Sequence, residues 1–116
     1  MLITVFTPTY NRAKLLPRLH KSLQEQTNKD FEWVIVDDGS VDATTDNVDQ
    51  FLKERKIVIT YIQQLNGGKH RALNRGVKEA KGELVLIVDS DDSLPNESLS
   101  IIYSYYVDIK DNPSIG

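Results

Sequence analysis

Residues 84–92 read Leu-Val-Leu-Ile-Val-Asp-Ser-Asp-Asp, so five aliphatic side chains are followed by three carboxylates within four positions. The aliphatic run, residues 84–88, shows no polar alternation, which is typical of a strand buried on both faces of a parallel sheet. Ligands of open α/β sheets gather outside the carboxyl ends of the strands, where Asp89, Asp91 and Asp92 are expected to lie. Carboxylates this crowded favour a divalent cation between them, Mg²⁺ or Mn²⁺. The alternative is a solvated turn that caps the following helix, because acidic loops are common.

Composition bounds the class of protein. Hydrophobic residues make up 40% of the 116 residues and charged residues 27%, as in an ordinary globular domain or a part of one. A formal net charge of -3 argues against a nucleic-acid binder that relies on a basic surface. The chain has no cysteine, and its two histidines lie far apart, so thiolate and histidine-rich zinc sites are not expected. No apolar run approaches the length of a membrane span and no basic secretion signal opens the chain, so we expect a cytoplasmic protein.

Three further aliphatic segments predict strands, and the amphipathic segments that follow each strand predict helices. The strands are expected at residues 2–7, 31–36, 57–62 and 84–88. The helices are expected from about Asn11 to Gln26, from Asp42 past Leu52, from Lys69 to Ala80, and from Ser93 past Tyr106. This alternation implies βαβ units, and therefore an α/β fold with a mostly parallel sheet flanked by helices.

The same patterns give residue-level expectations. We expect Pro8 to close the first strand, because proline donates no ladder hydrogen bond, and Asn11 to cap the first helix. The side chains expected on the buried helix faces are Leu15, Leu16, Leu19, Leu23, Val48, Phe51, Leu52, Ala72, Leu73, Gly76, Val77, Ala80, Leu99, Ile102, Tyr103 and Tyr106.

A second acidic pair, Asp37-Asp38, follows the second strand, and Tyr10 lies in the turn after the first strand. In a parallel sheet these strand ends share one edge with the carboxylates at residues 89–92. An aromatic ring, a carboxylate and a cluster ready to bind metal together suit a nucleotide diphosphate. Tyr10 would wall the base, a carboxylate would accept its N–H, and a metal would neutralise the phosphates. The alternative for residues 37–40 is a plain turn, since Asp, Gly and Ser all favour turns.

Basic residues crowd the start of the third predicted helix, at Lys69, His70 and Arg71. Positive charge there opposes the helix macrodipole, whereas a bound anion would be stabilised by it. Together with Asn66-Gly67-Gly68 just before it, this segment is interpreted as a phosphate or substrate edge, or alternatively as a solvated basic helix face. It does not match a Walker A loop, and the chain contains no G-x-G-x-x-G or G-x-S-x-G pattern.

Five segments in fixed order resemble the family-2 glycosyltransferases, which have the Rossmann-like GT-A fold. The segments are Thr7-Pro8-Thr9-Tyr10-Asn11-Arg12, Val36-Asp37-Asp38-Gly39-Ser40-x-Asp42-x-Thr44, Asn66-Gly67-Gly68-Lys69-His70-x-Ala72-Leu73-Asn74-x-Gly76, Ala80-x-Gly82-Glu83 and Asp89-x-Asp91-Asp92. Their order and spacing match the family over residues 2–99. One segment alone would be a weak signal, but five in register are specific.

The resemblance implies roles for individual residues. Pro8 and Tyr10 would contact the nucleotide base, and Asp38 would bind uracil or its counterpart in another nucleotide. Asp91, with Asp92 as the close alternative, would hold Mn²⁺ or Mg²⁺ on the diphosphate of the sugar nucleotide. The complete set expected to bind the donor is Pro8, Thr9, Tyr10, Asn11, Arg12, Asp37, Asp38, Gly68, Lys69, His70, Asp89 and Ser90.

The implied reaction is transfer of a sugar from a nucleotide sugar, most simply a UDP-sugar, to an acceptor hydroxyl with inversion at the anomeric carbon. The acceptor would be a glycan or a lipid-linked acceptor in polysaccharide synthesis, and a longer parent protein would work in the cytoplasm or at the cytosolic face of a membrane. Two departures matter. Leu73 stands where many relatives carry Arg, and no residue matches the family's general base, a carboxylate downstream of the metal motif. We therefore expect residues 1–116 to be the donor-binding part of a domain truncated at its C-terminus, with the base beyond residue 116.

Other α/β proteins share parts of the pattern. A receiver domain places its acidic pair after the first strand, whereas the pair here follows the second. A sugar-phosphate nucleotidyltransferase shares the metal and diphosphate chemistry but normally carries a Gly-rich basic loop after strand one, where this chain offers only Arg12. A non-catalytic nucleotide-binding module remains an alternative because no base is matched. An EF-hand is excluded, since the acidic loop at residue 89 lacks the Gly at position six and the Glu at position twelve.

Overall fold

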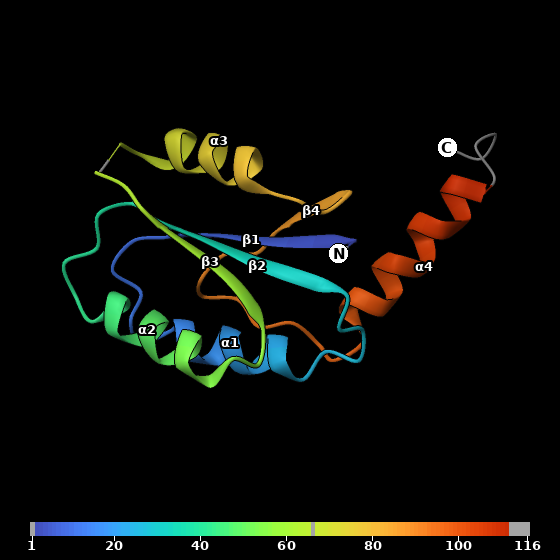
Figure 1. Ribbon diagram of the computed structural model, residues 1–116, viewed down its shortest axis with the longest axis horizontal. Helices are drawn as coiled ribbons and strands as arrows, with labels where there is room; N and C mark the ends of the chain where they lie inside the picture. Colours follow the sequence, from blue (N-terminus) through green and yellow to red (C-terminus); the bar gives the residue numbers. More distant parts are fainter. Residues whose placement is uncertain (1, 66, 112–116) are drawn as a thin grey trace.

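The computed structural model describes residues 2–65 and 67–111. Strands and helices alternate along the chain in the order β1 (Ile3–Thr9), α1 (Leu16–Gln24), β2 (Phe31–Asp37), α2 (Thr44–Glu54), β3 (Val58–Gln63), α3 (Lys69–Glu79), β4 (Leu84–Ile87) and α4 (Ser98–Asp111). The strands pair in parallel in the order β3-β2-β1-β4, which makes β1 and β2 central within the described sheet. Helices α1 and α2 cover one face of this sheet and α3 the other, while α4 projects away from the body (Figure 1). The predicted α/β architecture with a parallel sheet is confirmed.

The larger core layer lies between the sheet and helices α1 and α2. Trp33 in β2 is fully buried there, and its indole N–H donates to the Thr7 hydroxyl at 2.9 Å. The imidazole of His20 stacks on Phe51 at 3.9 Å between ring centroids and lies 5.9 Å from Trp33. A histidine buried among aromatic rings is easier to accommodate in its neutral form, and burial accordingly lowers the pKa of His20.

The second core layer lies under α3 and is thinner. Its buried members are Phe6, Val34, Val36 and Ala72. Gly76 lets the helix approach this closely, because a Cβ added there would stand 2.2 Å from a ring carbon of Phe6. The small residues at two successive turns of α3 therefore set the distance between helix and sheet.

A buried polar network joins the start of β1 to the turn before β4. Glu32 is 2% exposed, and its Oε2 accepts hydrogen bonds from the Thr4 hydroxyl at 2.6 Å and the Lys81 N–H at 2.7 Å. The Thr4 hydroxyl oxygen in turn accepts from the Gly82 N–H at 2.9 Å. A Cβ at Gly82 would stand 2.7 Å from the Thr4 backbone nitrogen, so only glycine fits this close turn. The network anchors the chain just before it enters β4.

Strand β1 continues through Pro8 to Thr9, so the prediction that Pro8 closes this strand is wrong. The backbone N–H and C=O of Phe6 point toward β4, since its carbonyl oxygen accepts from the Val88 N–H at 2.9 Å. The backbone groups of Thr9 point toward β2, since its carbonyl oxygen accepts from the Asp38 N–H at 2.9 Å. Pro8 lies two residues after Phe6 and therefore faces the β4 side, beyond the end of β4. Its missing N–H costs no ladder hydrogen bond at that position.

The prediction that Asn11 caps the first helix is also wrong. Helix α1 begins at Leu16 with Pro17 in its first turn and has no side-chain cap. Asn11 adopts a left-handed backbone with φ 52°, and its side-chain oxygen accepts from the Val41 N–H at 2.8 Å instead. Asparagine tolerates this conformation better than most residues, and here it serves the loop rather than the helix.

Three helix residues expected in the core are exposed. Leu52, Val77 and Tyr103 have 41%, 54% and 41% of their surfaces exposed. Helix α3 touches the sheet through the narrow face of Ala72 and Gly76. Helix α4 packs on the core through Leu99 and Ile102 near its start and then projects away from the body (Figure 1). Periodicity marks an apolar stripe but does not say how much of the stripe finds a neighbour.

Strand β4 also differs from its expected burial on both faces. It forms an edge of the described sheet, with Val85 40% and Ile87 50% exposed. Both alternate with half-buried residues and lie on the α3 side, because Ile87 pairs with Phe6. An uninterrupted aliphatic run is thus compatible with an edge position here. Among the described helices, none is long and apolar enough to span a membrane.

Candidate functional site

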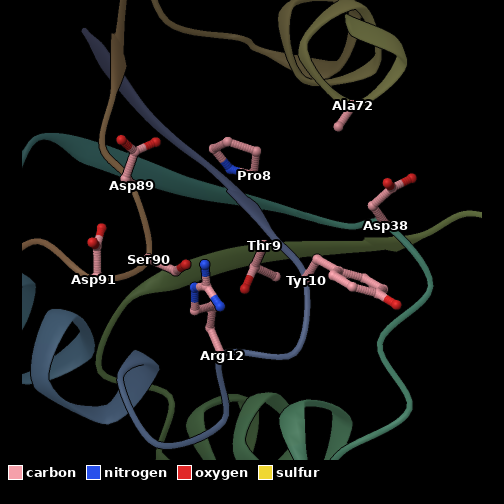
Figure 2. Close-up of a pocket in the computed structure, with 9 residues that line it drawn as sticks. All are labelled: Pro8, Thr9, Tyr10, Arg12, Asp38, Ala72, Asp89, Ser90 and Asp91. Carbon is pink, nitrogen blue, oxygen red and sulfur yellow. The ribbon is translucent and has the colours of Figure 1, made fainter. Parts of the chain in front are cut away.

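A cavity of about 350 Å³ opens at the carboxyl ends of β1 and β2, beside the loop that follows β4. This volume lies in the range of small-molecule sites. Tyr10 and Asp38 stand at one end of the cavity, and Asp89 and Asp91 at the other (Figure 2). Its lining consists of Pro8, Thr9, Tyr10, Arg12, Asp38, Ala72, Asp89, Ser90 and Asp91. All except Ala72 belong to the residues that the sequence predicts for donor or metal binding.

The turn after β1 is fastened to the turn after β2. The Asn11 N–H donates to the Ser40 hydroxyl at 2.8 Å, and the Ala13 N–H donates to an Asp42 carboxylate oxygen at 3.1 Å. Together with the contact from Val41 to the Asn11 side chain, these bonds cross between the two loops. Asn11 does not line the cavity; it holds the loop from which its neighbours do.

Two polar side chains, one from the end of β1 and one from the turn that follows it, face the middle of the cavity. Thr9 is 4% exposed, and its hydroxyl is the buried side-chain polar atom without a hydrogen-bond partner among the described residues. Figure 2 shows the guanidinium of Arg12 directed toward Ser90, between the two ends of the cavity. A buried, unpaired hydroxyl is costly unless a ligand or water completes it. The middle of the cavity therefore offers a free hydroxyl and a cation.

The adjacent carboxylates Asp37 and Asp38 have different surroundings. Asp37 is 1% exposed, and it accepts hydrogen bonds from the Tyr61 hydroxyl at 2.5 Å and the Ser40 N–H at 2.9 Å. Burial, followed by the hydrogen bond to Asp37, raises the pKa of Tyr61 to about 12. Asp37 therefore lies behind the cavity and braces the end of β2, whereas Asp38 lines the cavity.

Asp38 is half-buried and has three donors around it. Its Oδ1 accepts from Gln64 Nε2 at 2.9 Å and from the Gly67 N–H at 2.8 Å, and its Oδ2 accepts from the Gly68 N–H at 3.1 Å. These contacts, with the Gln64 amide first, lower the pKa of Asp38. The carboxylate is therefore held ionised, as a hydrogen-bond acceptor, at one end of the cavity.

At the other end, Asp89, Asp91 and Asp92 form a cluster. Each offers an oxygen, and these oxygens lie within 4.8 Å of one another. The Asp92 N–H donates to the Asp89 carbonyl at 3.0 Å, which folds the loop back and brings the side chains together. All three are exposed, and hard carboxylate oxygens at this spacing fit Mg²⁺ or Mn²⁺. Asp92 belongs to the cluster without lining the cavity.

The predicted phosphate edge at the start of α3 is only partly at the site. Gly68 precedes the helix with φ 89°, a conformation that glycine adopts without strain, and its N–H points to Asp38. His70 is exposed and does not line the cavity. The side chain of Lys69 lies outside the described residues. The first turn of α3 contains no acidic residue of its own, and the Asp38 carboxylate, bound to the Gly67 and Gly68 N–H groups, is the negative charge at its N-terminus.

Sequence reasoning missed two residues at this site. Ala72, expected only as a core residue, also lines the cavity. Gln64 was not singled out, although it follows β3 directly and contacts Asp38. The strand-end rule applied to β3, as it was to the other strands, would have drawn attention to Gln64.

The family model described as Glycosyl transferase family 2 matches residues 4–112. The chain belongs to this family. Among curated proteins, glycosyltransferase GlyG of Streptococcus pneumoniae is 36% identical over 102 residues, which cover 88% of this chain and 34% of GlyG. The chain thus spans about a third of that relative, and 18% of the poly(ribitol-phosphate) beta-N-acetylglucosaminyltransferase TarS of Staphylococcus aureus.

Solved structures agree with the family. A structure of S. aureus TarS in complex with UDP-GlcNAc matches with a TM-score of 0.86 and 36% identity, over 96% of this chain and 32% of that one. The mannosyltransferase PcManGT of Pyrobaculum calidifontis, in complex with GDP-Man and Mn²⁺, matches with a TM-score of 0.76 and 34% identity, over 80% of this chain and 28% of that one. The predicted Rossmann-like GT-A fold is confirmed by these matches.

Proposed function

We propose that this chain is the donor-binding part of an inverting glycosyltransferase that moves a sugar from a UDP-sugar to an acceptor hydroxyl. One observation carries the proposal. One cavity has Tyr10 and Asp38 at one end and, at its other end, a carboxylate cluster that includes Asp89 and Asp91. A nucleoside diphosphate has the same division, with a hydrogen-bonding base at one end and a charged diphosphate at the other. Family membership and the UDP-GlcNAc bound to TarS support this assignment.

The base end would hold the nucleoside. Tyr10 is 44% exposed, and its ring stands beside the cavity, where a flat base can pack on it. The ionised Asp38 carboxylate would accept an N–H of the base. Pro8 adds a rigid apolar wall, while Thr9 and Arg12 reach the space between the two ends. The free Thr9 hydroxyl would be completed by a ribose or phosphate oxygen.

The carboxylate end would hold a divalent metal ion, Mn²⁺ or Mg²⁺, through Asp91 and Asp92 with Asp89 beside them. The ion supplies charge neutralisation of the leaving diphosphate and orients the donor. The Mn²⁺ in the PcManGT complex supports a metal of this kind. Ser90, 5% exposed, lines the cavity between the acidic residues and would border the donor sugar or phosphate.

The residues of this cavity account for the donor and the metal, but not for binding or activation of the acceptor. No residue matches a general base for the acceptor hydroxyl, and Asp37 is buried and engaged with Tyr61. We propose that residues 1–116 are part of a longer domain that supplies the base and binds a glycan or lipid-linked acceptor, acting in the cytoplasm. The short share of GlyG and TarS that the chain covers supports this view.

The test is calorimetric titration of UDP into the folded chain with and without Mn²⁺, beside the variant Asp91→Ala. We expect binding that requires the metal and falls at least about tenfold in Asp91→Ala, since the lost ligand contact is charge-assisted. Asp49→Ala removes an equally exposed carboxylate on α2 and should bind like wild type. A folded wild-type chain that binds neither UDP nor GDP with Mn²⁺ would contradict the proposal.

A further inference from the structure

The hydrogen bonds that the described residues make to Asp38 occupy some, but not all, of the acceptor positions of its carboxylate. A carboxylate offers about four acceptor positions, two on each oxygen. Gln64 Nε2 and the Gly67 N–H take both positions on Oδ1, at 2.9 and 2.8 Å. The Gly68 N–H takes one position on Oδ2, at 3.1 Å. Among the contacts that the described residues make, one acceptor position therefore remains, on Oδ2 of a residue that lines the cavity.

Gln64 is the replaceable member of this set. The two glycine contacts come from the backbone at the start of α3, whereas the third comes from a side chain that follows β3. Without that side chain, Asp38 would present one open position on each oxygen. Two adjacent open positions form a bidentate acceptor, and one open position forms a single acceptor.

Nucleobases differ in what they offer such an acceptor. The uracil edge presents one ring N–H between two carbonyl oxygens, which matches a single acceptor position. The guanine edge presents two parallel donors, the ring N–H and the exocyclic amine, which need both oxygens of a carboxylate. Cytosine and adenine turn a ring nitrogen lone pair toward the carboxylate beside their amine, which is repulsive. A donor left unpaired in a partly buried site is penalised.

We propose that Gln64 is a specificity-determining residue that positions Asp38 as a single hydrogen-bond acceptor and thereby selects uracil against guanine. The inference rests on the proposed function, because it assumes that the nucleoside of the donor binds at the Asp38 end of the cavity. Gln64 acts through Asp38 and is a positioning residue. The hydrogen bond from Gln64 comes first among the causes that lower the pKa of Asp38, followed by the glycine N–H groups and, last, by the positive charge of Arg71, so the acceptor stays ionised.

The experiment measures the dissociation constants of UDP and GDP, each with Mn²⁺, for the whole chain and its variants. Gln64→Ala removes the contact, and Gln64→Leu removes it while keeping most of the side-chain volume. Gln63→Ala is the matched control, since the Gln63 amide donates to Thr45 at 3.0 Å rather than to Asp38. Circular dichroism and thermal unfolding verify that each variant is folded.

We expect wild type and Gln63→Ala to bind UDP at least about tenfold more tightly than GDP, because guanine would leave a donor unpaired. In both Gln64 variants the preference should shrink by about fivefold or more, the size expected for one regained hydrogen bond. A general weakening from loop damage would lower both affinities together and leave their ratio unchanged. The ratio therefore separates selection from stability.

The outcomes distinguish this inference from the proposed function. UDP binding with an unchanged ratio in folded Gln64→Ala or Gln64→Leu overturns the role of Gln64 and leaves the donor site standing. A wild-type preference for GDP also overturns it, while still supporting a nucleotide-sugar site. A folded wild type that binds neither nucleotide overturns both.

Discussion

Tyr61 donates its hydroxyl hydrogen to Asp37, and this bond separates the tasks of two carboxylates that are neighbours in the chain. Successive residues at a strand end point to opposite sides, so Asp37 turns into the body and Asp38 turns to the cavity. The first is satisfied by protein groups alone, including the Ser40 N–H. The second keeps one acceptor position that no described residue fills.

Removing the Tyr61 hydroxyl should therefore weaken the fold more than the site. In Tyr61→Phe we expect the free energy of unfolding to fall by about 1–2 kcal/mol, because a buried carboxylate loses one of its donors. Urea unfolding measures this loss. UDP affinity should change by less than about threefold, a shift below the net value of one hydrogen bond. Asp38→Ala should give the reverse pattern, and Tyr105→Phe, at a 67% exposed tyrosine, should change neither quantity. Equal effects of Tyr61→Phe and Asp38→Ala on UDP binding would contradict the division of roles.

The buried pair of Thr4 and Glu32 predicts a non-additive response. Thr4→Val removes a hydroxyl that both donates to Glu32 and accepts from Gly82, so we expect a loss of about 2–3 kcal/mol in the free energy of unfolding. Adding Glu32→Met to Thr4→Val should recover only part of that loss, because no carboxylate is then left unpaired but the Lys81 and Gly82 N–H groups lack their acceptors. Chemical denaturation of the two single variants and the double variant completes the cycle. If the losses in the free energy of unfolding of the two single variants simply add up in the double variant, the contact between Thr4 and Glu32 does not contribute to stability.

His20 predicts a pH dependence of stability. Burial, the largest cause, lowers the pKa of His20, with Glu54 opposing the shift and Lys56 adding to it. The unfolded chain takes up the proton near pH 6.5, before the folded chain does. The contribution is therefore fully present above pH 6.5 and is lost as the pH falls through 6.5 toward the lower pKa of the folded state.

Urea unfolding of wild type and His20→Phe between pH 5 and pH 7.5 measures this contribution as a difference. The wild type should lose more stability on acidification than His20→Phe, because phenylalanine keeps the stack on Phe51 but binds no proton. His70→Gln removes the exposed histidine and should follow the wild-type curve. Parallel curves for wild type and His20→Phe would mean that His20 does not resist protonation.

Much of this molecule can be predicted from local pattern. Aliphatic runs broken by acidic turns give the strands, and their parallel direction follows from the intervening helices. The carboxyl-end rule brings residues such as Tyr10, Asp38 and Asp91 to one cavity. These inferences succeed because they depend on periodicity and connectivity, which the sequence contains directly.

The features that cannot be predicted from the sequence depend on the direction of a side chain at a strand end and on which element packs beside it. Asp37 and Asp38 are the same residue type, and only the pleat decides which one faces the cavity. Pro8 fits inside β1 because β4 ends before the residue that would accept a hydrogen bond from an N–H at position 8. The point at which β4 ends cannot be predicted from the sequence of β1. Val85 and Ile87 are exposed because no described element covers them, although their aliphatic run resembles that of a central strand.

The bonds that Asn11 makes across two loops have a thermodynamic consequence. The loops after β1 and β2, which carry the base end of the cavity, are fixed to each other without a ligand. The Asn11 N–H donates to the Ser40 hydroxyl, and the Asn11 side-chain oxygen accepts from the Val41 N–H. Ordering a loop on association costs conformational entropy that would be subtracted from affinity. Asn11, in its left-handed backbone conformation, holds the two loops in place before a ligand binds, so this entropic cost is smaller. Asn11 would therefore raise the affinity for a nucleotide that it does not touch.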